Sequence, residues 1–312
     1  MNDLMPKSFT TILLIGEGGL VKELGVRLLQ EEHSVWALVP TEGLSPSYAR
    51  LGINPLVADL SEPFLAKMAV ANADVVYHLA GRRQHGVPTP EPADLKALQT
   101  ILSVIPRGRI KRYIYESSLA VYDGAVPPSE AKGEVVSVSA ANHSPKVMDE
   151  TVFCRPKSAT GRIHLEAERE ILARFSEEGF PGILLRAGAL YQALPGVIDQ
   201  IRRGVYSIPS DLPPILHRIY LEDYLDILVA ALEKGRPGQT YNVVDQEPHT
   251  PVQYFSQMAS LLGAAPPLSS LAPPSETPVC YQNQKLIREF NRPLRFPTFR
   301  EGLRHGIEKA GI

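Results

Sequence analysis

The feature that most constrains the fold is a short apolar run that ends in a glycine-rich turn. Thr11–Ile15 (TILLI) forms the run, and residues 16–19 (GEGG) follow it directly. A continuous apolar run of this length is typical of a strand buried on both faces. Leu20, Leu24 and Leu28 then recur at helical spacing. In this strand–turn–helix order, backbone N–H groups can reach the pyrophosphate of a dinucleotide.

Strand-like and helix-like segments alternate through the rest of the first half of the chain. The predicted helices include Asp94–Ile105 and Arg162–Phe175. The predicted strands are Val35–Val39, Asn54–Ala58, Val75–Leu79, Arg112–Glu116, Gly182–Leu190 and Thr240–Val244. Strands separated by helices predict right-handed βαβ units, and hence an α/β fold built on a parallel sheet.

The composition excludes several classes of protein. Of 312 residues, 44% are apolar and 21% are charged, as in an ordinary globular protein. With 32 Lys and Arg against 34 Asp and Glu, the net charge of −2 indicates neither a nucleic-acid nor an anionic-membrane partner. Two cysteines form no disulfide framework, and no Cys/His spacing suggests a metal site. No apolar run reaches the roughly 20 residues of a membrane helix, and no signal peptide is evident, so we expect a cytoplasmic protein.

The glycine turn departs from the usual dinucleotide pattern in its third glycine. That glycine corresponds to Val21 in one register and to Lys22 in the other. Because the third glycine mainly permits close packing of helix on strand, its loss is compatible with binding. Glu17 places an anion in a loop that would receive anions. The alternative is a plain glycine-rich turn between a strand and a helix.

The end of the second predicted strand normally selects between NAD and NADP. A carboxylate there bonds the ribose of NAD, whereas a basic residue accepts the extra phosphate of NADP. Residues 39–42 (VPTE) place no carboxylate at the strand end, and Arg50 lies further on. The sequence therefore favours NADP, or no cofactor, over NAD. Asp59, after the third strand, suits either a contact with the adenine amino group or the N-cap of a helix over Ser61–Val70.

Several segments together resemble a known family. The segments are ILLIGEGGLVKELGVRLLQEEHSV, VADL, VVYHLAG, RYIYESSLAVYDG, LRAGALYQ, RIYLEDYLDILVAAL and TYNVVDQEP, in this order. They resemble the extended short-chain dehydrogenase/reductases, the NAD-dependent epimerase/dehydratase group. The later NRPLRFPTFREGL is similar to the atypical branch described as nucleoside-diphosphate-sugar epimerases.

The resemblance implies a Rossmann-type, doubly wound parallel sheet with a smaller C-terminal substrate-binding region. The sheet domain would take in residues 1–190, with later strands returning at 215–248. The smaller region would take in 191–214 and 249–312. The cofactor site implied by the resemblance and by the glycine turn comprises Gly16, Gly18, Gly19, Leu20, Val21, Thr41, Asp59, Leu60, Leu79, Ala80 and Gly81.

The family also implies a catalytic Ser or Thr after the fifth strand and a Tyr-x-x-x-Lys pair on the following long helix. Ser118 falls on the serine, and Tyr122 either lines the substrate pocket or packs. Thr160 stands in place of the tyrosine and His164 in place of the lysine. A threonine hydroxyl is far too weak an acid for the role of the tyrosine. His164 is therefore either a replacement acid/base, oriented by Glu168 on the same helical face, or a residue that merely packs.

Candidate substrate-side residues follow the fourth and fifth strands and the late strands. Arg82, Arg83 and His85 either hold a phosphate or carboxylate or form a solvated loop. Glu116 is either a buried proton carrier with a raised pKa or a solvent-facing carboxylate. Tyr191 and Arg218 are weaker candidates, and His78 suits a structural role.

The segment 123–147 is longer than the corresponding link in the family, and within it apolar and polar residues alternate over Gly133–Ser139 as in a strand. This insertion is either a lid, a partner-contacting arm or a passive surface loop. The predicted function is an NAD(P)-binding epimerase, dehydratase or reductase acting on a hydroxyl or carbonyl compound such as a nucleotide sugar. The alternatives are a catalytically silent ligand sensor or scaffold and a non-redox isomerase or lyase. The family resemblance further implies a homodimer, formed through Asp94–Ile105 and Arg162–Phe175.

Overall fold

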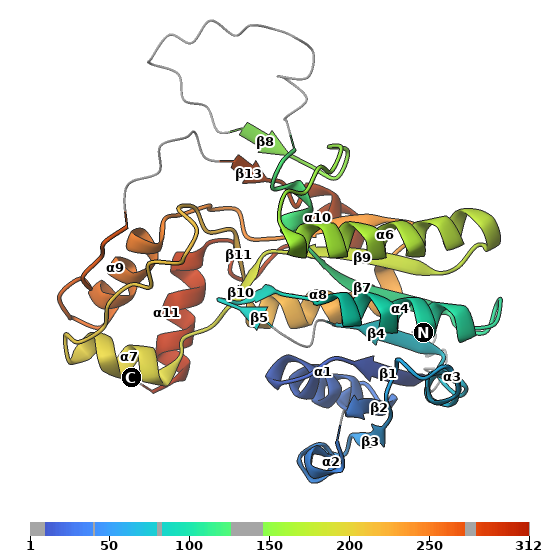
Figure 1. Ribbon diagram of the computed structural model, residues 1–312. Coiled ribbons are helices and arrows are strands. Elements are labelled where there is room, and N and C mark those ends of the chain that lie inside the picture. The colour runs from blue at the N-terminus through green and yellow to red at the C-terminus, as the bar shows by residue number, and fades with distance from the viewer. Residues whose placement is uncertain (1–9, 40, 80–82, 126–145, 272–278, 312) are drawn as a thin grey trace, which may run out of the picture.

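The fold is built on one seven-stranded sheet. The computed structural model describes residues 10–39, 41–79, 83–125, 146–271 and 279–311 (Figure 1). All neighbouring strands of the sheet are parallel, in the order β3-β2-β1-β4-β7-β9-β12. These strands are β1 (Thr11–Ile15), β2 (Ser34–Val39), β3 (Asn54–Val57), β4 (Val75–His78), β7 (Arg112–Ser118), β9 (Gly182–Ala187) and β12 (Thr240–Val243). The α/β, Rossmann-type prediction is confirmed.

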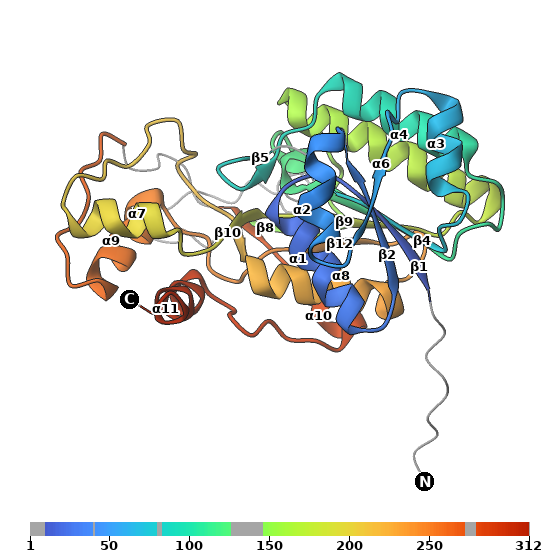
Figure 2. The same cartoon turned by 90° about the horizontal axis from the view of Figure 1, so that it is seen from below.

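Helices cover both faces of the sheet (Figure 2). One face carries α1 (Gly19–Gln30), α8 (Leu221–Lys234) and α10 (Gln284–Phe290) over a core that includes Leu24, Ile114 and Leu228. The other carries α3 (Pro63–Val70), α4 (Pro92–Val104) and α6 (Ala159–Glu178) over a core that includes Leu13, Ile101 and Ile171. Because central strands such as β1 contribute side chains to both cores, the nearly continuous apolar runs in the sequence follow directly.

A third core lies beside the sheet, at the left of Figure 1. Strands β10 (Ala189–Tyr191) and β11 (Arg218–Tyr220) form a separate parallel pair there. Around them pack α7 (Pro195–Arg202), α9 (Pro251–Leu261) and α11 (Phe299–Lys309). The domain bounds drawn from the sequence stay a prediction.

The remaining elements are short. They are η1 (Glu42–Leu44), α2 (Ser45–Ala49), the hairpin β5 (Arg83–Gln84) and β6 (Val87–Pro88), η2 (Leu119–Tyr122), β8 (Lys146–Met148) and β13 (Val279–Tyr281). Strands β8 and β13 pair with each other. The strand expected at Gly133–Ser139 lies outside the described residues.

One predicted strand is wrong in its extent. The sequence predicts a single strand over Gly182–Leu190, but β9 ends at Ala187 and residues 189–191 leave the sheet to pair with β11. Gly188 stands at the break, where a Cβ would lie only 2.8 Å from the carbonyl oxygen of His217. A glycine is therefore needed for the two chain segments to approach so closely. The other predicted strands and helices end within a few residues of those observed.

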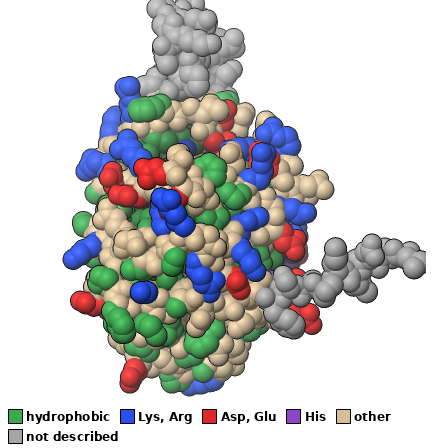
Figure 3. Space-filling view, turned by 90° about the vertical axis from the view of Figure 1, so that its right-hand side faces the viewer, with side chains coloured by type: hydrophobic (Ala, Val, Ile, Leu, Met, Phe, Trp, Pro, Cys, Tyr) green, Lys and Arg blue, Asp and Glu red, His purple; other side chains and the backbone are tan. Residues whose placement is uncertain are grey.

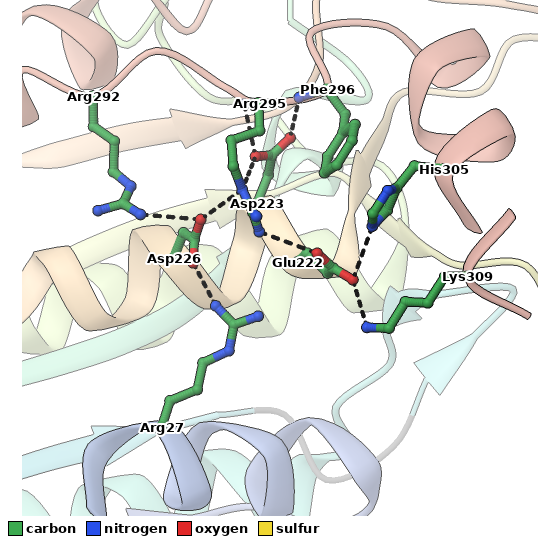
Figure 4. A network of polar contacts seen from close by, with 9 residues as sticks. All are labelled: Arg27, Glu222, Asp223, Asp226, Arg292, Arg295, Phe296, His305 and Lys309. Atoms are coloured by element: carbon green, nitrogen blue, oxygen red, sulfur yellow. Dashed lines mark hydrogen bonds and ion pairs between the residues drawn. The ribbon is translucent and has the colours of Figure 1, made fainter. Parts of the chain in front are cut away.

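Acidic residues at the start of α8 bind the segment that leads to α11 (Figure 4). The Asp223 carboxylate accepts the backbone N–H groups of Arg295 and Phe296, both at 2.9 Å. Glu222 pairs with Lys309 at 2.7 Å and with Arg295 at 3.1 Å. The neighbouring Asp226 pairs with Arg27 of α1 and, on the C-terminal side, with Arg292 and Arg295. One helix thus joins the first helix of the sheet domain to the C-terminal segment.

The surface agrees with the balanced composition where it is seen. Figure 3 shows basic and acidic side chains interspersed over the face at the right of Figure 1. Among the described residues, no helix combines the length and apolar character needed to cross a bilayer. The same part of the chain contains no cluster of three His, Cys, Asp or Glu side chains able to hold a metal ion.

Candidate functional site

The glycine turn has the conformation that only glycines adopt easily. Gly16 and Gly18 have φ angles of 136° and 84°. A Cβ on Gly16 would lie 2.9 Å from the carbonyl oxygen of Leu79 and 3.2 Å from Cγ2 of Val21. Val21 itself is fully buried against this turn, which explains how the loop packs without a third glycine.

The start of α1 is open toward a cavity. A Cβ built on Gly18 or Gly19 would meet no atom within 4 Å, and both residues line the cavity. Gly18 is the N-cap of α1, so the N–H groups of the first turn have no intrahelical acceptor. Open N–H groups at a helix N-terminus are suited to a phosphate. These residues therefore fit the pyrophosphate of a dinucleotide.

The cavity has a volume of about 540 Å³ and extends from the glycine turn to the third core. Its far wall is aromatic and aliphatic, formed by Tyr191, Tyr206, Leu212, Tyr254, Phe255 and Met258. Sequence reasoning identified Tyr191 but missed the other five residues. Tyr206 and Leu212 lie between α7 and β11, whereas the other three lie on α9, and no motif marks either segment.

The β5–β6 hairpin forms one side of this cavity. His85 and Gly86 both have positive φ, 49° and 86°, as a tight hairpin turn requires. The carbonyl of Gly86 accepts the N–H of Leu190 at 3.0 Å, and a Cβ on Gly86 would lie 2.1 Å from the Leu190 carbonyl oxygen. His85 Nε2 lies 2.8 Å from Oδ2 of Asp211, so the hairpin also contacts the smaller region.

A buried ion pair stands between this cavity and a second, smaller one. Arg83 lines the large cavity, and its Nη2 donates to Glu116 Oε2 at 2.5 Å. The Glu116 carboxylate also accepts the hydroxyl of Tyr224 at 2.6 Å and lines a pocket of about 40 Å³. Glu116 is thus buried and paired rather than solvent-facing.

His164 lines the smaller pocket. Its Nδ1 lies 3.1 Å from the hydroxyl of Tyr115, while its Nε2 is buried and has no hydrogen-bond partner in the described part of the chain. Burial lowers the pKa of His164 to about 4, so the ring is neutral at pH 7. His78 is likewise buried, bonded to the hydroxyl of Tyr113 at 2.7 Å, and burial lowers its pKa to about 4. Thr160, one helical turn before His164, is half-buried.

Glu168 shares the buried face of α6 with His164 but bonds other groups. Its carboxylate accepts Nε and Nη2 of Arg186 at 2.9 and 2.6 Å, and the hydroxyl of Ser117 at 2.6 Å. Arg186 in turn donates to the hydroxyl of Tyr122 at 2.6 Å. The Tyr122 hydroxyl donates to Asn242 at 3.0 Å, which fixes this tyrosine among packed groups.

Ser118 ends β7 and caps η2. Its Oγ accepts the N–H of Ala120 at 3.2 Å, and the side chain is buried. Neither Ser118 nor Thr160 lines the large cavity or the small pocket. His164 and Glu116 line the same small pocket. The hydrogen bond of Ser118 to Ala120 links Ser118 to neither His164 nor Glu116.

The remaining cofactor candidates divide into buried and exposed residues. Leu60 and Leu79 are buried, and the N–H of Leu79 donates to Ile15 at 2.8 Å. Thr41 is exposed at the start of η1. Asp59 is exposed and accepts the N–H of Ser61 at 2.8 Å, a bond that lowers its pKa. It closes the turn before α3 but does not cap the helix, whose N-cap is Glu62.

Three candidates, Ala80, Gly81 and Arg82, lie outside the described residues. Arg218 is within them and lines the cavity, where its guanidinium lies 4.1 Å from the ring centre of Tyr254.

Comparison with known proteins gives both a family and relatives. Residues 12–244 match the family described as NAD dependent epimerase/dehydratase family. The chain is 24% identical over 245 residues to a 4-hydroxy-2-methyl-3-oxo-4-farnesyl-3,4-dihydroquinoline-1-oxide ketoreductase of Stigmatella aurantiaca, covering 76% of this chain and 69% of that one. It is 23% identical over 266 residues to a 2-alkyl-3-oxoalkanoate reductase of Stenotrophomonas maltophilia, covering 81% and 76%.

Among solved structures, dTDP-glucose 4,6-dehydratase from Bacillus anthracis in complex with NAD has a similar fold. Its TM-score is 0.74 at 16% identity, covering 97% of this chain and 96% of that one.

Proposed function

Since the chain belongs to the NAD-dependent epimerase/dehydratase family, we propose that it is an NAD(P)H-dependent reductase of a largely apolar ketone. One observation carries the proposal: a single cavity joins the glycine turn to an aromatic pocket in the smaller region. A pocket lined by Tyr206, Phe255 and Met258 favours an apolar substrate over the hydroxyl-rich ring of a sugar. Both curated relatives named above are reductases of ketones by name.

The cofactor site is proposed on the glycine turn. The first-turn N–H groups of α1 would bind the pyrophosphate, and Gly18 and Gly19 leave the space it needs. Beyond β2, which ends at Val39, Thr41 and Glu42 are exposed. Because no carboxylate closes this strand, we propose that NADPH binds at least as tightly as NADH. When bound, the reduced nicotinamide supplies a hydride to the carbonyl carbon.

Groups of the protein must then stabilise the carbonyl oxygen and supply the one proton that it gains. From the family resemblance we propose Ser118 for this oxygen, although it does not line the cavity; its Oγ accepts the N–H of Ala120 and keeps its own hydrogen to donate. An alkoxide is basic enough to take a proton from a weak acid. His164 is neutral at pH 7, so its ring can accept a proton at one nitrogen and donate from the other; we propose it as the proton relay, although its contacts in the described chain do not reach Ser118.

The first test is a fluorescence titration of the purified protein with NADPH and with NADH. We expect both to bind, with NADPH at least as tight. A clear preference for NADH refutes the proposal that the end of β2 favours NADPH. Failure to bind either cofactor refutes the reductase.

The second test is the oxidation of NADPH in the presence of benzylacetone, an aromatic methyl ketone. Ser118→Ala is expected to lower kcat/KM by about 10²-fold, as removal of one hydrogen bond to a developing oxyanion does. Ser117→Ala is the matched control, because Ser117 is the preceding residue of β7 and bonds Glu168 of α6. Equal losses in the two variants refute the role of Ser118.

The second candidate function is a catalytically silent ligand-binding protein. It is favoured by a specific observation: Ser118, Tyr122, Thr160 and His164 all lie outside the lining of the large cavity. Cofactor binding without turnover of any ketone would support this alternative.

A further inference from the structure

The cavity contains a buried positive charge that the fold does not neutralise. Arg218 lies on β11, is 7% exposed and lines the cavity. Its Nε is buried and has no hydrogen-bond partner among the described residues. No carboxylate in the same part of the chain lies within 4.0 Å of its guanidinium, which packs instead on the ring of Tyr254. Burying an unpaired charge costs free energy that a structural role would not justify.

The other charged groups that line the described part of the cavity are already paired or face solvent. Arg83 is paired with Glu116, and His85 with Asp211. Glu17 and Glu23 are negative and lie at the glycine turn, at the opposite end from the aromatic wall. Among the described residues, the aromatic end of the cavity therefore has one unmatched cation, which is Arg218.

Asp245 is the acidic group to consider as a counter-ion, because its backbone N–H donates to the Arg218 carbonyl at 2.7 Å. It is buried, and its Oδ2 has no partner in the described chain. Burial raises the pKa of Asp245 well above its usual value, which disfavours the ionised form, although Arg218 opposes this shift. Among the described residues, the Asp245 carboxylate lies beyond 4.0 Å of the Arg218 guanidinium and forms no ion pair with it, so the Arg218 charge is open to a ligand.

We propose that Arg218 binds the carboxylate of the substrate, so that the cavity takes a keto acid with an aromatic or aliphatic body. This inference rests on the proposed reductase for the keto group, but the anion site can be tested without turnover. A guanidinium binds a carboxylate through two parallel N–H···O bonds. A single unmatched cation in the described part of the cavity favours a monoanion over a doubly charged phosphate. The rings of Tyr191, Tyr206 and Phe255 would contact the apolar body.

The experiment compares two probes of nearly the same shape, hydrocinnamate and hydrocinnamamide, by isothermal titration calorimetry on the full-length protein. Wild type is expected to bind the acid about 10–100-fold more tightly than the amide, the range of a charge-assisted hydrogen bond. Arg218→Met should remove this difference while leaving the affinity for the amide unchanged. Arg218→Lys should retain part of this difference in affinity, because lysine keeps the positive charge but cannot form the two parallel hydrogen bonds.

The matched control is Arg203→Met, because Arg203 is 69% exposed and pairs only with Asp199 of its own helix. It should behave as wild type. Equal binding of acid and amide to wild type, no binding of the acid at millimolar concentration, or an equal loss of both probes in Arg218→Met overturns the proposal. Tighter binding of phenylphosphonate than of hydrocinnamate also overturns it, in favour of a phosphate ligand. If wild type binds the acid more tightly than the amide but shows no NADPH-dependent turnover, the anion site is supported and only the proposed reductase activity is refuted.

Discussion

Removing the charge of Glu168 should destabilise the protein far more than an identical change two residues earlier. The carboxylate is buried and accepts two hydrogen bonds from Arg186 and one from Ser117. Glu168→Gln keeps the shape but leaves the Arg186 guanidinium buried without a counter-ion. Breaking one partner of a buried ion pair costs about 3–5 kcal/mol. With an m-value of about 3 kcal/mol/M, the urea midpoint should fall by about 1–1.7 M.

The assay is urea unfolding followed by circular dichroism at pH 7.5. Glu166→Gln is the control, because Glu166 lies on the exposed face of the same helix with a single ion pair to Arg169 at 3.8 Å. Exposed pairs contribute about 0–1 kcal/mol, so its midpoint should hardly move. The double variant Glu168→Leu/Arg186→Met should recover much of the loss, because apolar pairs often replace buried ion pairs without cost. The reasoning is refuted if Glu168→Gln costs no more than Glu166→Gln.

Three further predictions concern protonation, catalysis and assembly. Burial lowers the pKa of both His78 and His164 from 6.5 to about 4, so below pH 6.5 the unfolded chain binds protons that the folded chain does not. Stability should therefore fall as the pH drops from 6.5 toward 4. Urea midpoints at pH 7 and pH 5 measure this, and an identical slope in His164→Gln would exclude His164 as a source. His164→Ala should lower the turnover of benzylacetone at least about 10²-fold if the ring relays the proton; unchanged turnover would make it a packing residue only. Light scattering should give the mass of a homodimer, and a monomer at high concentration would contradict the assembly expected through α4 and α6.

The sheet could be predicted closely because its signals are local. Apolar runs bounded by glycines and helical periodicity depend on residues adjacent in the chain, so β1, β7 and α6 begin and end near the predicted residues. The break at Gly188 could not be predicted, because a glycine within an apolar run is compatible with a continuous strand. Only the approach of the chain at His217, far along the sequence, requires the turn.

The site could be predicted only where its residues lie together in one segment of the sequence. The glycine turn is such a segment, and its positive φ angles are those that the spacing of Gly16 and Gly18 suggests. The partner of Glu168 was not predictable, because helical spacing places it on the face of His164 whereas Arg186 reaches it from the next strand. The aromatic wall was missed for the same reason: Tyr206 and Tyr254 meet only through tertiary packing.

The ion pairs at the start of α8 affect the order in which the protein can form during synthesis. Glu222 and Asp223 obtain their partners from residues 295–309, which the ribosome makes some seventy or more residues later. Until then, these two carboxylates interact with the N-terminus of their own helix, where negative charge is favourable. During synthesis α8 can therefore dock early through its apolar face and the Asp226–Arg27 pair, whereas the C-terminal segment is fixed on it only after residues 295–309 have emerged.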